Sequence, residues 1–227
     1  MQDPVEISLD AGTLHQAEDF AKSHNTTILV IMFTDLVGST EMGSAKGNIY
    51  AQKIRKKHNE LIAPIIEHEG HGKIIKSTGD GFLAIYVDPT FAVKRALEIQ
   101  RVLYEHNTNS SNTIEIRIGI DMGQVLVEGA GADLDIFGNH VNRAARIESL
   151  APGGHIYISN RVYDDAAAWI GTSEDQQYRW QFHGEFPLKG VRAPTSIYEV
   201  YDSQVLNEPQ FPSVHGIDIA SRPAFEL

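Results

Sequence analysis

Two aspartates stand where predicted strands end, and this placement suits metal-ion chemistry. Asp35 follows the apolar run 28–33 after one intervening residue, and this run is typical of a central strand buried on both faces. Asp80 stands in the turn 77–81 between two shorter predicted strands, where its Asp-Gly pair is a strong hairpin signal. If these strands are neighbours, two carboxylates converge and offer hard oxygen ligands to Mg²⁺ or Mn²⁺. A pair of such ions serves in-line phosphoryl transfer, whereas each aspartate taken alone could be only a helix cap or a turn former.

The residues after Asp35 could bind a phosphate group. The segment 36–40 contains Gly38 and Ser39 and leads directly into a predicted helix, whose first N–H groups would point outward near the carboxylates. A structural turn capped by Ser39 explains the same residues. Further along, Asn142 and Arg146 are four residues apart and share one face of a predicted helix. An amide and a guanidinium together could orient a ribose and stabilise charge on a reacting phosphate, although a solvated face with a paired Arg146 is the alternative.

The periodicity predicts the elements that must position these residues. A strand over 28–33 precedes a long helix that ends near residue 69 and contains Pro64 in its last turns. The further expected strands are 73–76, 82–87, 114–120 with a turn at Gly123 into 125–127, 155–159, 178–182 and 196–201. The further expected helices are 90–105, 138–150 and 161–169. The order β-α-β-β-α-β indicates an α+β protein with a ferredoxin-like core, an antiparallel-containing sheet and helices on one face.

Composition excludes several classes of protein. The 227 residues carry a net charge of −11, which disfavours a nucleic-acid binder, and the absence of cysteine excludes disulfide scaffolds and thiol catalysis. We find no secretory signal and no apolar run that could span a membrane, so we expect a cytoplasmic protein without membrane insertion. The expected organisation is an N-terminal extension over 1–27, one catalytic domain over 28–201 and a C-terminal tail over 202–227.

Four segments together resemble the class III nucleotidyl cyclases, the adenylate and guanylate cyclase catalytic domain. Residues 33–40 are similar to the family's first metal motif, and 76–80 to the hairpin with the second metal aspartate and a base-reading lysine. Residues 135–146 resemble its signature helix, and 188–190 its late triphosphate-binding lysine. The order and spacing also match, over about residues 27–201. The resemblance implies a ferredoxin-like βαββαβ core of the class III cyclase type, with extra C-terminal strands and helix.

The resemblance also implies a homodimer with composite sites. One chain would supply the ligands of two Mg²⁺ or Mn²⁺ ions: Asp35, the Leu36 carbonyl and Asp80. Phe33, Val37, Gly38, Ser39 and Thr40 would line the substrate beside them. The other chain would supply Lys76 and Asp135 to the base, Asn142 to the ribose and Arg146 to the transition state. Lys189 would reach the β- and γ-phosphates, and no general base can be assigned. An upstream sensor domain or a protein regulator is a further expected partner.

The base-reading pair favours ATP. Lys76 can donate to a ring nitrogen and Asp135 can accept from an exocyclic amine, which is the pattern on adenine. Guanine presents the reverse pattern, and family guanylate cyclases carry other residues at these positions, whereas cytosine presents the same pattern as adenine. We therefore expect an adenylate cyclase that forms cyclic AMP and pyrophosphate. A cyclase for CTP or GTP and a catalytically silent, nucleotide-binding regulatory domain are the alternatives. A palm-type polymerase or diguanylate cyclase is disfavoured because its Gly-Gly-Asp/Glu-Glu-Phe motif is missing.

Overall fold

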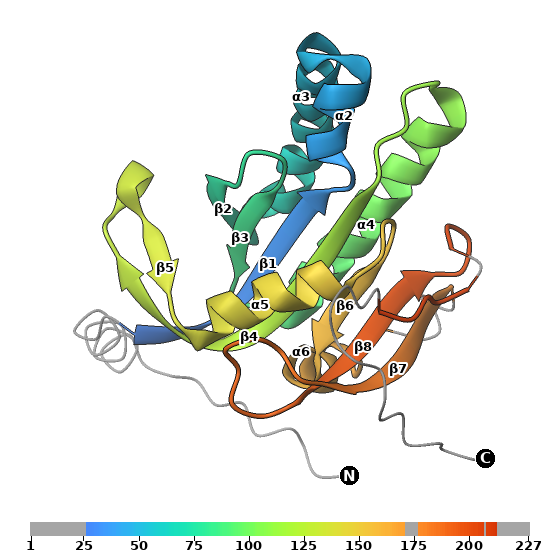
Figure 1. The fold of residues 1–227 in the computed structure, drawn as a ribbon. Helices are drawn as coiled ribbons and strands as arrows, with labels where there is room; N and C mark the ends of the chain where they lie inside the picture. Colours follow the sequence, from blue (N-terminus) through green and yellow to red (C-terminus); the bar gives the residue numbers. More distant parts are fainter. Residues whose placement is uncertain (1–25, 171–176, 207, 213–227) are drawn as a thin grey trace.

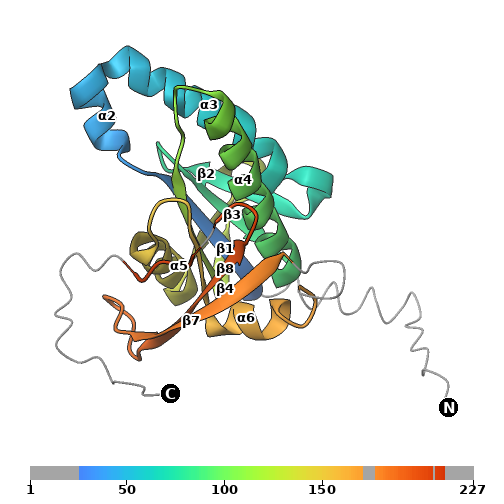
Figure 2. The same ribbon diagram turned by 90° about the vertical axis from the view of Figure 1, so that its right-hand side faces the viewer.

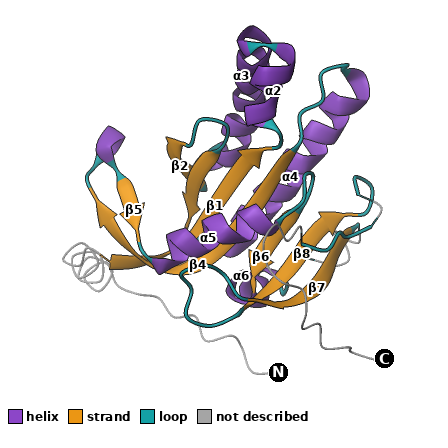
Figure 3. Ribbon diagram, viewed as in Figure 1, coloured by secondary structure: helices purple, strands orange, loops and turns teal. Residues whose placement is uncertain are grey.

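The computed structural model describes residues 26–170, 177–206 and 208–212, which form one mixed sheet flanked by helices (Figure 1; Figure 3). The strands are β1 (Thr26–Leu36), β2 (Gly72–Ser77), β3 (Phe82–Tyr86), β4 (Ile116–Glu128), β5 (Asp135–Phe137), β6 (Ile156–Ser159), β7 (Tyr178–Phe186) and β8 (Thr195–Asp202). The helices are α2 (Ser39–Lys46), α3 (Asn48–Ile66), α4 (Pro89–Asn109), α5 (Asn139–Leu150) and α6 (Asn160–Ala166). The strand order is β2-β3-β1-β4-β6-β8-β7, with β5 paired to β4. The predicted α+β fold class is therefore confirmed.

Strand β1 lies inside the sheet, as its apolar sequence predicts. It pairs antiparallel with β3 on one side and with β4 on the other. Among the pairs of described strands, only β4 and β6 are parallel. Val30 and Met32 are fully buried in the core with α3 and α4, whereas Ile31 is fully buried in a second core on the opposite face. A strand with apolar residues on both faces needs cover on both faces, and the fold supplies it.

The helices cover both faces of the sheet, so the expectation of helices on one face is wrong. Helices α3, α4 and α6 pack on one side, and α5 lies on the other (Figure 2). Helix α5 contributes Ala144, Ile147 and Leu150 to the cores on its side. These three residues recur at helical spacing, and burying them against the strands closes the second apolar face of the sheet.

Glycine positions explain two other differences from the predicted elements. The expected single helix up to residue 69 is broken into α2 and α3 at Gly47, which adopts a φ of 87°. Pro64 does lie in the last turn of α3. The expected turn at Gly123 is absent, because β4 runs through it without interruption. A Cβ atom at Gly123 would lie 2.3 Å from the His140 ring, so this glycine permits the close approach of α5.

The chain ends fall mostly outside the described residues. The expected N-terminal extension lies there up to residue 25, and so does the tail from residue 213. In the described part of the tail, the backbone carbonyl of Gln210 accepts a hydrogen bond from the Tyr157 hydroxyl. Among the described helices, none has the length and apolar character needed to cross a membrane.

Candidate active site

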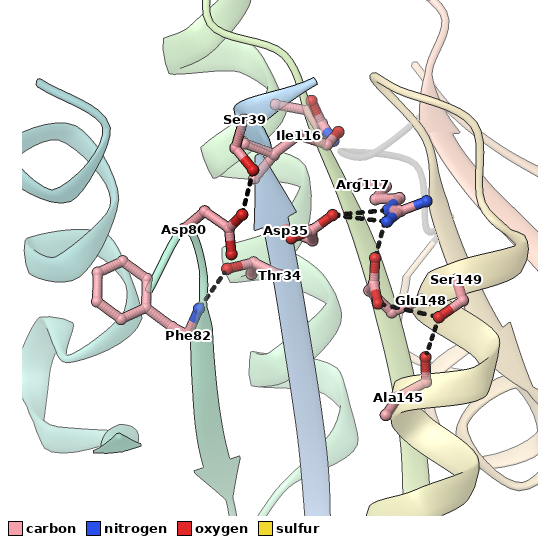
Figure 4. A network of polar contacts seen from close by, with 11 residues as sticks. Thr34, Asp35, Ser39, Asp80, Phe82, Ile116, Arg117, Ala145, Glu148 and Ser149 are labelled. Carbon is pink, nitrogen blue, oxygen red and sulfur yellow. Dashed lines mark hydrogen bonds and ion pairs between the residues drawn. The ribbon is translucent and has the colours of Figure 1, made fainter. Parts of the chain in front are cut away.

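The C-terminal end of β1 and the turn between β2 and β3 meet at the same end of the sheet's strands. They bring Asp35 and Asp80 together there (Figure 4). The Leu36 N–H donates to the Asp80 carbonyl over 3.1 Å, and the Phe82 N–H donates to Thr34 Oγ1 over 3.0 Å. A Cβ atom at Gly81 would lie 1.7 Å from the Thr34 carbonyl oxygen, so only glycine allows the turn this close. The convergence expected from the sequence is therefore present.

The segment after Asp35 is arranged around Asp80 and the start of α2. Gly38, with a φ of 69°, precedes the helix, and Ser39 does not cap it. The Ser39 hydroxyl donates instead to Asp80 Oδ2. The N–H groups of Leu36 and Val37 are taken by the carbonyls of Asp80 and Glu115, so an anion could reach only the N–H groups from Gly38 onward.

The remaining predicted lining residues are placed as follows. Val37 is 37% exposed beside this helix start. Phe33 is half-buried and packs with Ile31 and Leu83, so it supports the end of β1 from the α5 side. The side chain of Thr40, the second residue of α2, lies outside the described part of the structure.

Asp35 already has a cationic partner that the sequence analysis missed. Arg117 stands directly opposite it in the β1–β4 register, and its Nη2 and Nε lie 2.6 and 3.0 Å from Asp35 Oδ2. Burial raises the pKa of Asp35, Arg117 opposes this rise, and the nearby Asp80 adds to it. The sequence around Arg117 shows only the alternation of apolar and polar residues that is typical of a strand. The contact with Asp35 becomes evident only when the pairing of β1 with β4 is known.

Glu148 lies on the far side of the Arg117 guanidinium. Its Oε1 is 2.5 Å from Arg117 Nε, and its side chain is 11% exposed. Burial raises the pKa of Glu148 to about 7, with Arg117 opposing the rise and Asp35 contributing to it. The guanidinium therefore lies between a buried carboxylate and a candidate metal ligand (Figure 4).

A second residue that the sequence did not reveal, His58, packs against Phe82 directly after the turn that carries Asp80. It is fully buried on α3 between Ile54 and Ile62, at the spacing of one helix face. Its ring stacks on Phe82 with centroids 5.5 Å apart, and its Nδ1 lies 2.8 Å from Asn59 Oδ1. Burial lowers the pKa of His58, so the ring that packs under the turn is neutral.

The predicted base readers meet at a different point, between β2 and β5. Lys76 Nζ lies 2.8 Å from Asp135 Oδ2, although 59 residues separate them in the sequence. Asp135 Oδ1 also accepts from the Ile136 N–H over 2.8 Å. The hydrogen bond from Lys76 is the main reason that the pKa of Asp135 is lowered. Both side chains remain accessible, with 49% and 30% exposure, so a ligand can reach the pair.

Helix α5 presents Asn142 and Arg146 outward. Both are exposed, and neither has a hydrogen-bond or ion-pair partner within the described ranges. The opposite side of the same helix is fixed by the fully buried Asp121, which accepts hydrogen bonds from Arg143 over 2.7 and 2.9 Å and lies 2.9 Å from His140 Nδ1. The alternative reading, in which Arg146 pairs with a nearby carboxylate on a solvated face, therefore has no such pair among the described residues.

Lys189 is also exposed and unpaired within the described residues. Leu188 is buried with Ile147 and Leu150, which places the Lys189 turn against α5. No hydrogen bond or ion pair among the described residues joins Asn142, Arg146 or Lys189 to Asp35 or Asp80. Within the described part of one chain, the two groups of candidate site residues therefore make no direct polar contact with each other.

The oxygen donors at the C-terminal end of β1 fit Mg²⁺ or Mn²⁺. Asp35, Asp80 and the Leu36 carbonyl are hard ligands, and these ions bind through one or two carboxylates plus substrate phosphates. No cluster of three or more His, Cys, Asp or Glu side chains suited to a metal occurs among the described residues. A metal here would thus complete its coordination with phosphate and water oxygens.

Comparison with known proteins identifies the family of this chain. The family model of the adenylate and guanylate cyclase catalytic domain matches residues 21–201. A putative adenylate cyclase 3 of Rhizobium meliloti is 29% identical over 140 residues, which cover 60% of this chain and 23% of that protein. The chain spans less than half the length of curated relatives such as this one.

Solved structures share the fold. The guanylyl cyclase Cya2 is 27% identical with a TM-score of 0.66, over 77% of this chain and 92% of that structure. An adenylate cyclase of Trypanosoma brucei is 21% identical with a TM-score of 0.70, over 85% and 96%, and at this identity it supports the fold alone. Since the family model covers most of the sequence, this chain belongs to the adenylate and guanylate cyclase catalytic domain family.

Proposed function

We propose that this protein is an adenylate cyclase that converts ATP to 3′,5′-cyclic AMP and pyrophosphate at two composite sites of a homodimer. In each site, one chain contributes Asp35 from the end of β1 and Asp80 from the β2–β3 turn. The partner contributes Asn142 and Arg146 from the exposed face of α5. The lack of a direct hydrogen bond or ion pair between these two groups in the described part of one chain supports this division. Relatives that are much longer than this chain fit an additional sensor domain or a protein regulator.

The observation that carries the choice of ATP is the contact between Lys76 and Asp135. A donor and an acceptor whose atoms lie 2.8 Å apart match the neighbouring ring nitrogen and exocyclic amine of adenine. Guanine would place an acceptor against Asp135 and a donor against Lys76, leaving polar groups badly paired. Cytosine offers the same pattern as adenine, so CTP is the main competitor in the experiment below.

The other residues have roles that follow from their chemistry. Asp35, Asp80 and the Leu36 carbonyl would hold two Mg²⁺ or Mn²⁺ ions, which supply Lewis acidity to the reacting oxygens when bound. The free N–H groups from Gly38 onward would bind phosphate oxygens at the start of α2. These groups and Lys189, which would neutralise the β- and γ-phosphates, together hold the triphosphate in one orientation.

Asn142 and Arg146 act on the reacting centre. Asn142 would orient the ribose so that its 3′-oxygen faces the α-phosphorus, and Arg146 would stabilise the charge on the α-phosphate oxygens. The 3′-oxygen forms a new bond to the α-phosphorus, the bond to the bridging oxygen breaks, and pyrophosphate leaves with its electron pair. The hydroxyl proton is lost to solvent, since none of the described side chains is assigned as its acceptor.

The test is to incubate the protein with each of the four ribonucleoside triphosphates and Mg²⁺ or Mn²⁺, and to identify the product by mass. We expect cyclic AMP from wild type and less than about a tenth of that rate from Asp35→Ala and Asp80→Ala. Cyclic CMP or cyclic GMP as the main product would change the assigned substrate. No cyclic product despite measurable ATP binding would show a silent regulatory domain.

A further inference from the structure

The carboxylate proposed to bind metal is held by a cation from its own chain. Both contacts of Arg117 with Asp35, from Nη2 and Nε, fall on the same oxygen, Oδ2. Because Asp35 and Arg117 are paired across β1 and β4, the contact is set by the sheet itself. A divalent ion that uses this oxygen therefore competes with Arg117 for it.

Arg117 has a second carboxylate to which it can turn. Glu148 approaches the guanidinium from α5 at 2.5 Å, and it is largely buried. Neither Asp80 nor Ser39 contacts Arg117, so the guanidinium is shared by Asp35 and Glu148 alone among the described residues (Figure 4). A guanidinium that leaves Asp35 would thus keep an ionic partner and would not be left as an unpaired, partly buried charge.

Metal binding also makes the present contact unfavourable. A divalent ion at Asp35 would stand close to the guanidinium, and like charges at this separation repel strongly where the surroundings are partly desolvated. Arg117 is only one-third exposed, so water screens this repulsion incompletely. The favourable arrangement with metal is therefore one in which Arg117 turns toward Glu148.

We propose that Arg117 is an internal counter-ion that holds Asp35 when no metal is bound, and that Glu148 retains Arg117 when a divalent ion takes its place. This inference rests on the proposed function for the metal role of Asp35. It makes Arg117 and Glu148 positioning residues that set the metal concentration at which the site fills. Removing Arg117 should strengthen metal binding. Neutralising Glu148 should weaken it, because Asp35 is then the only anionic partner left to Arg117 among the described residues.

The experiment measures binding of MnCl₂ alone, without nucleotide, from the electron paramagnetic resonance signal of free Mn²⁺. Titrations at about pH 8 keep Glu148 ionised, because burial raises its pKa to about 7. We expect Arg117→Gln to bind Mn²⁺ about tenfold more tightly than wild type and Glu148→Gln to bind it more weakly. Arg55→Gln, at an exposed position of α3, is the matched control for the change in net charge and should leave the affinity unchanged.

The outcomes separate a counter-ion from a merely structural ion pair. Unchanged or weaker Mn²⁺ binding by Arg117→Gln, or equal losses in both variants, would overturn the inference. If Arg117→Gln does not fold, Arg117→Lys replaces it, and its single ammonium should give a smaller gain in affinity. Asp35→Asn in the Arg117→Gln background must abolish the gain. Because the assay contains no nucleotide, a protein that shows these shifts but forms no cyclic nucleotide would refute only the proposed function.

Discussion

The composite site can be tested by mixing two inactive variants. Asp35→Ala removes a proposed metal ligand at the C-terminal end of β1. Arg146→Ala removes the exposed arginine of α5, which has no hydrogen bond or ion pair with Asp35 within the described residues. If each site takes these residues from different chains, a mixed dimer has one site with both defects and one intact site. Each variant alone has a defect in every site and should be inactive.

The expected recovery follows from counting sites. Random exchange makes about half of the dimers mixed, and each mixed dimer regains one site of two, so activity should reach roughly a quarter of wild type. The assay is cyclic AMP formation after subunit exchange, with exchange verified by pull-down of differently tagged chains. The recovered fraction should rise with protein concentration if the dimer is weak.

A matched mixture supplies the control. Asp35→Ala and Asp80→Ala affect the same half of the site, so every site of their mixed dimers remains defective and no recovery is expected. If the Asp35→Ala and Arg146→Ala mixture stays inactive although exchange is complete, each site is built within one chain. Recovery in both mixtures would refute the assignment of Asp35 and Asp80 to the same half.

Three further predictions concern stability and specificity. Asp121→Asn should lower the free energy of unfolding by about 3 kcal/mol in urea denaturation, because it weakens the buried pair with Arg143. Despite its burial, hydrogen bonds from α5 lower the pKa of Asp121, so this difference should shrink as the pH falls below about 3.8. Burial lowers the pKa of His58 from 6.5 in the folded protein. As the pH decreases below about 6.5, the unfolded chain therefore binds a proton that the folded chain does not, and the free energy of unfolding of the wild type should decrease. His58→Leu should show a smaller loss when unfolding is compared at about pH 5 and about pH 7.5. Lys76→Glu combined with Asp135→Gly should shift the measured ATP:GTP rate ratio toward GTP, because each mispaired buried polar group costs about 1–3 kcal/mol; an unchanged ratio would show that other residues read the base.

Local sequence signals predict the elements well where one local cause decides the structure. The apolar run in β1 and the Asp-Gly turn at Asp80 give the strand, the hairpin and the meeting of the two aspartates. Gly123 shows the limit, because a glycine can mark a turn or a close approach, and only the position of His140 reveals that the close approach applies. Likewise, the periodicity of α5 predicts an apolar helix face but not the face of the sheet on which it packs, because that choice depends on tertiary contacts.

The missed contacts at the candidate site have a similar cause. Lys76 and Asp135 can be paired from the family resemblance, since both positions carry a recognised motif. Arg117 stands in an alternating strand with no motif, and its role appears only when β1 and β4 are aligned residue by residue. The sequence gives even less indication of the role of Glu148. A glutamate in a helix is ordinarily exposed, whereas this one is buried against a guanidinium.

Helix α5 carries Asn142 and Arg146 of one group of candidate site residues and is connected to Asp35 of the other group through Arg117. Its exposed face presents Asn142 and Arg146, while Glu148 on its buried face holds Arg117 and, through it, Asp35. In the proposed two-fold dimer, Asp35 of a chain serves one site and Arg146 of the same chain serves the other. A metal ion that moved Arg117 from Asp35 toward Glu148, as proposed, would therefore change the contacts of the helix that supplies the opposite site in this dimer. Because coupling between sites requires an element with two arrangements, the guanidinium that Asp35 and Glu148 share would be such an element among the described residues if the proposed dimer and the proposed movement of Arg117 both hold.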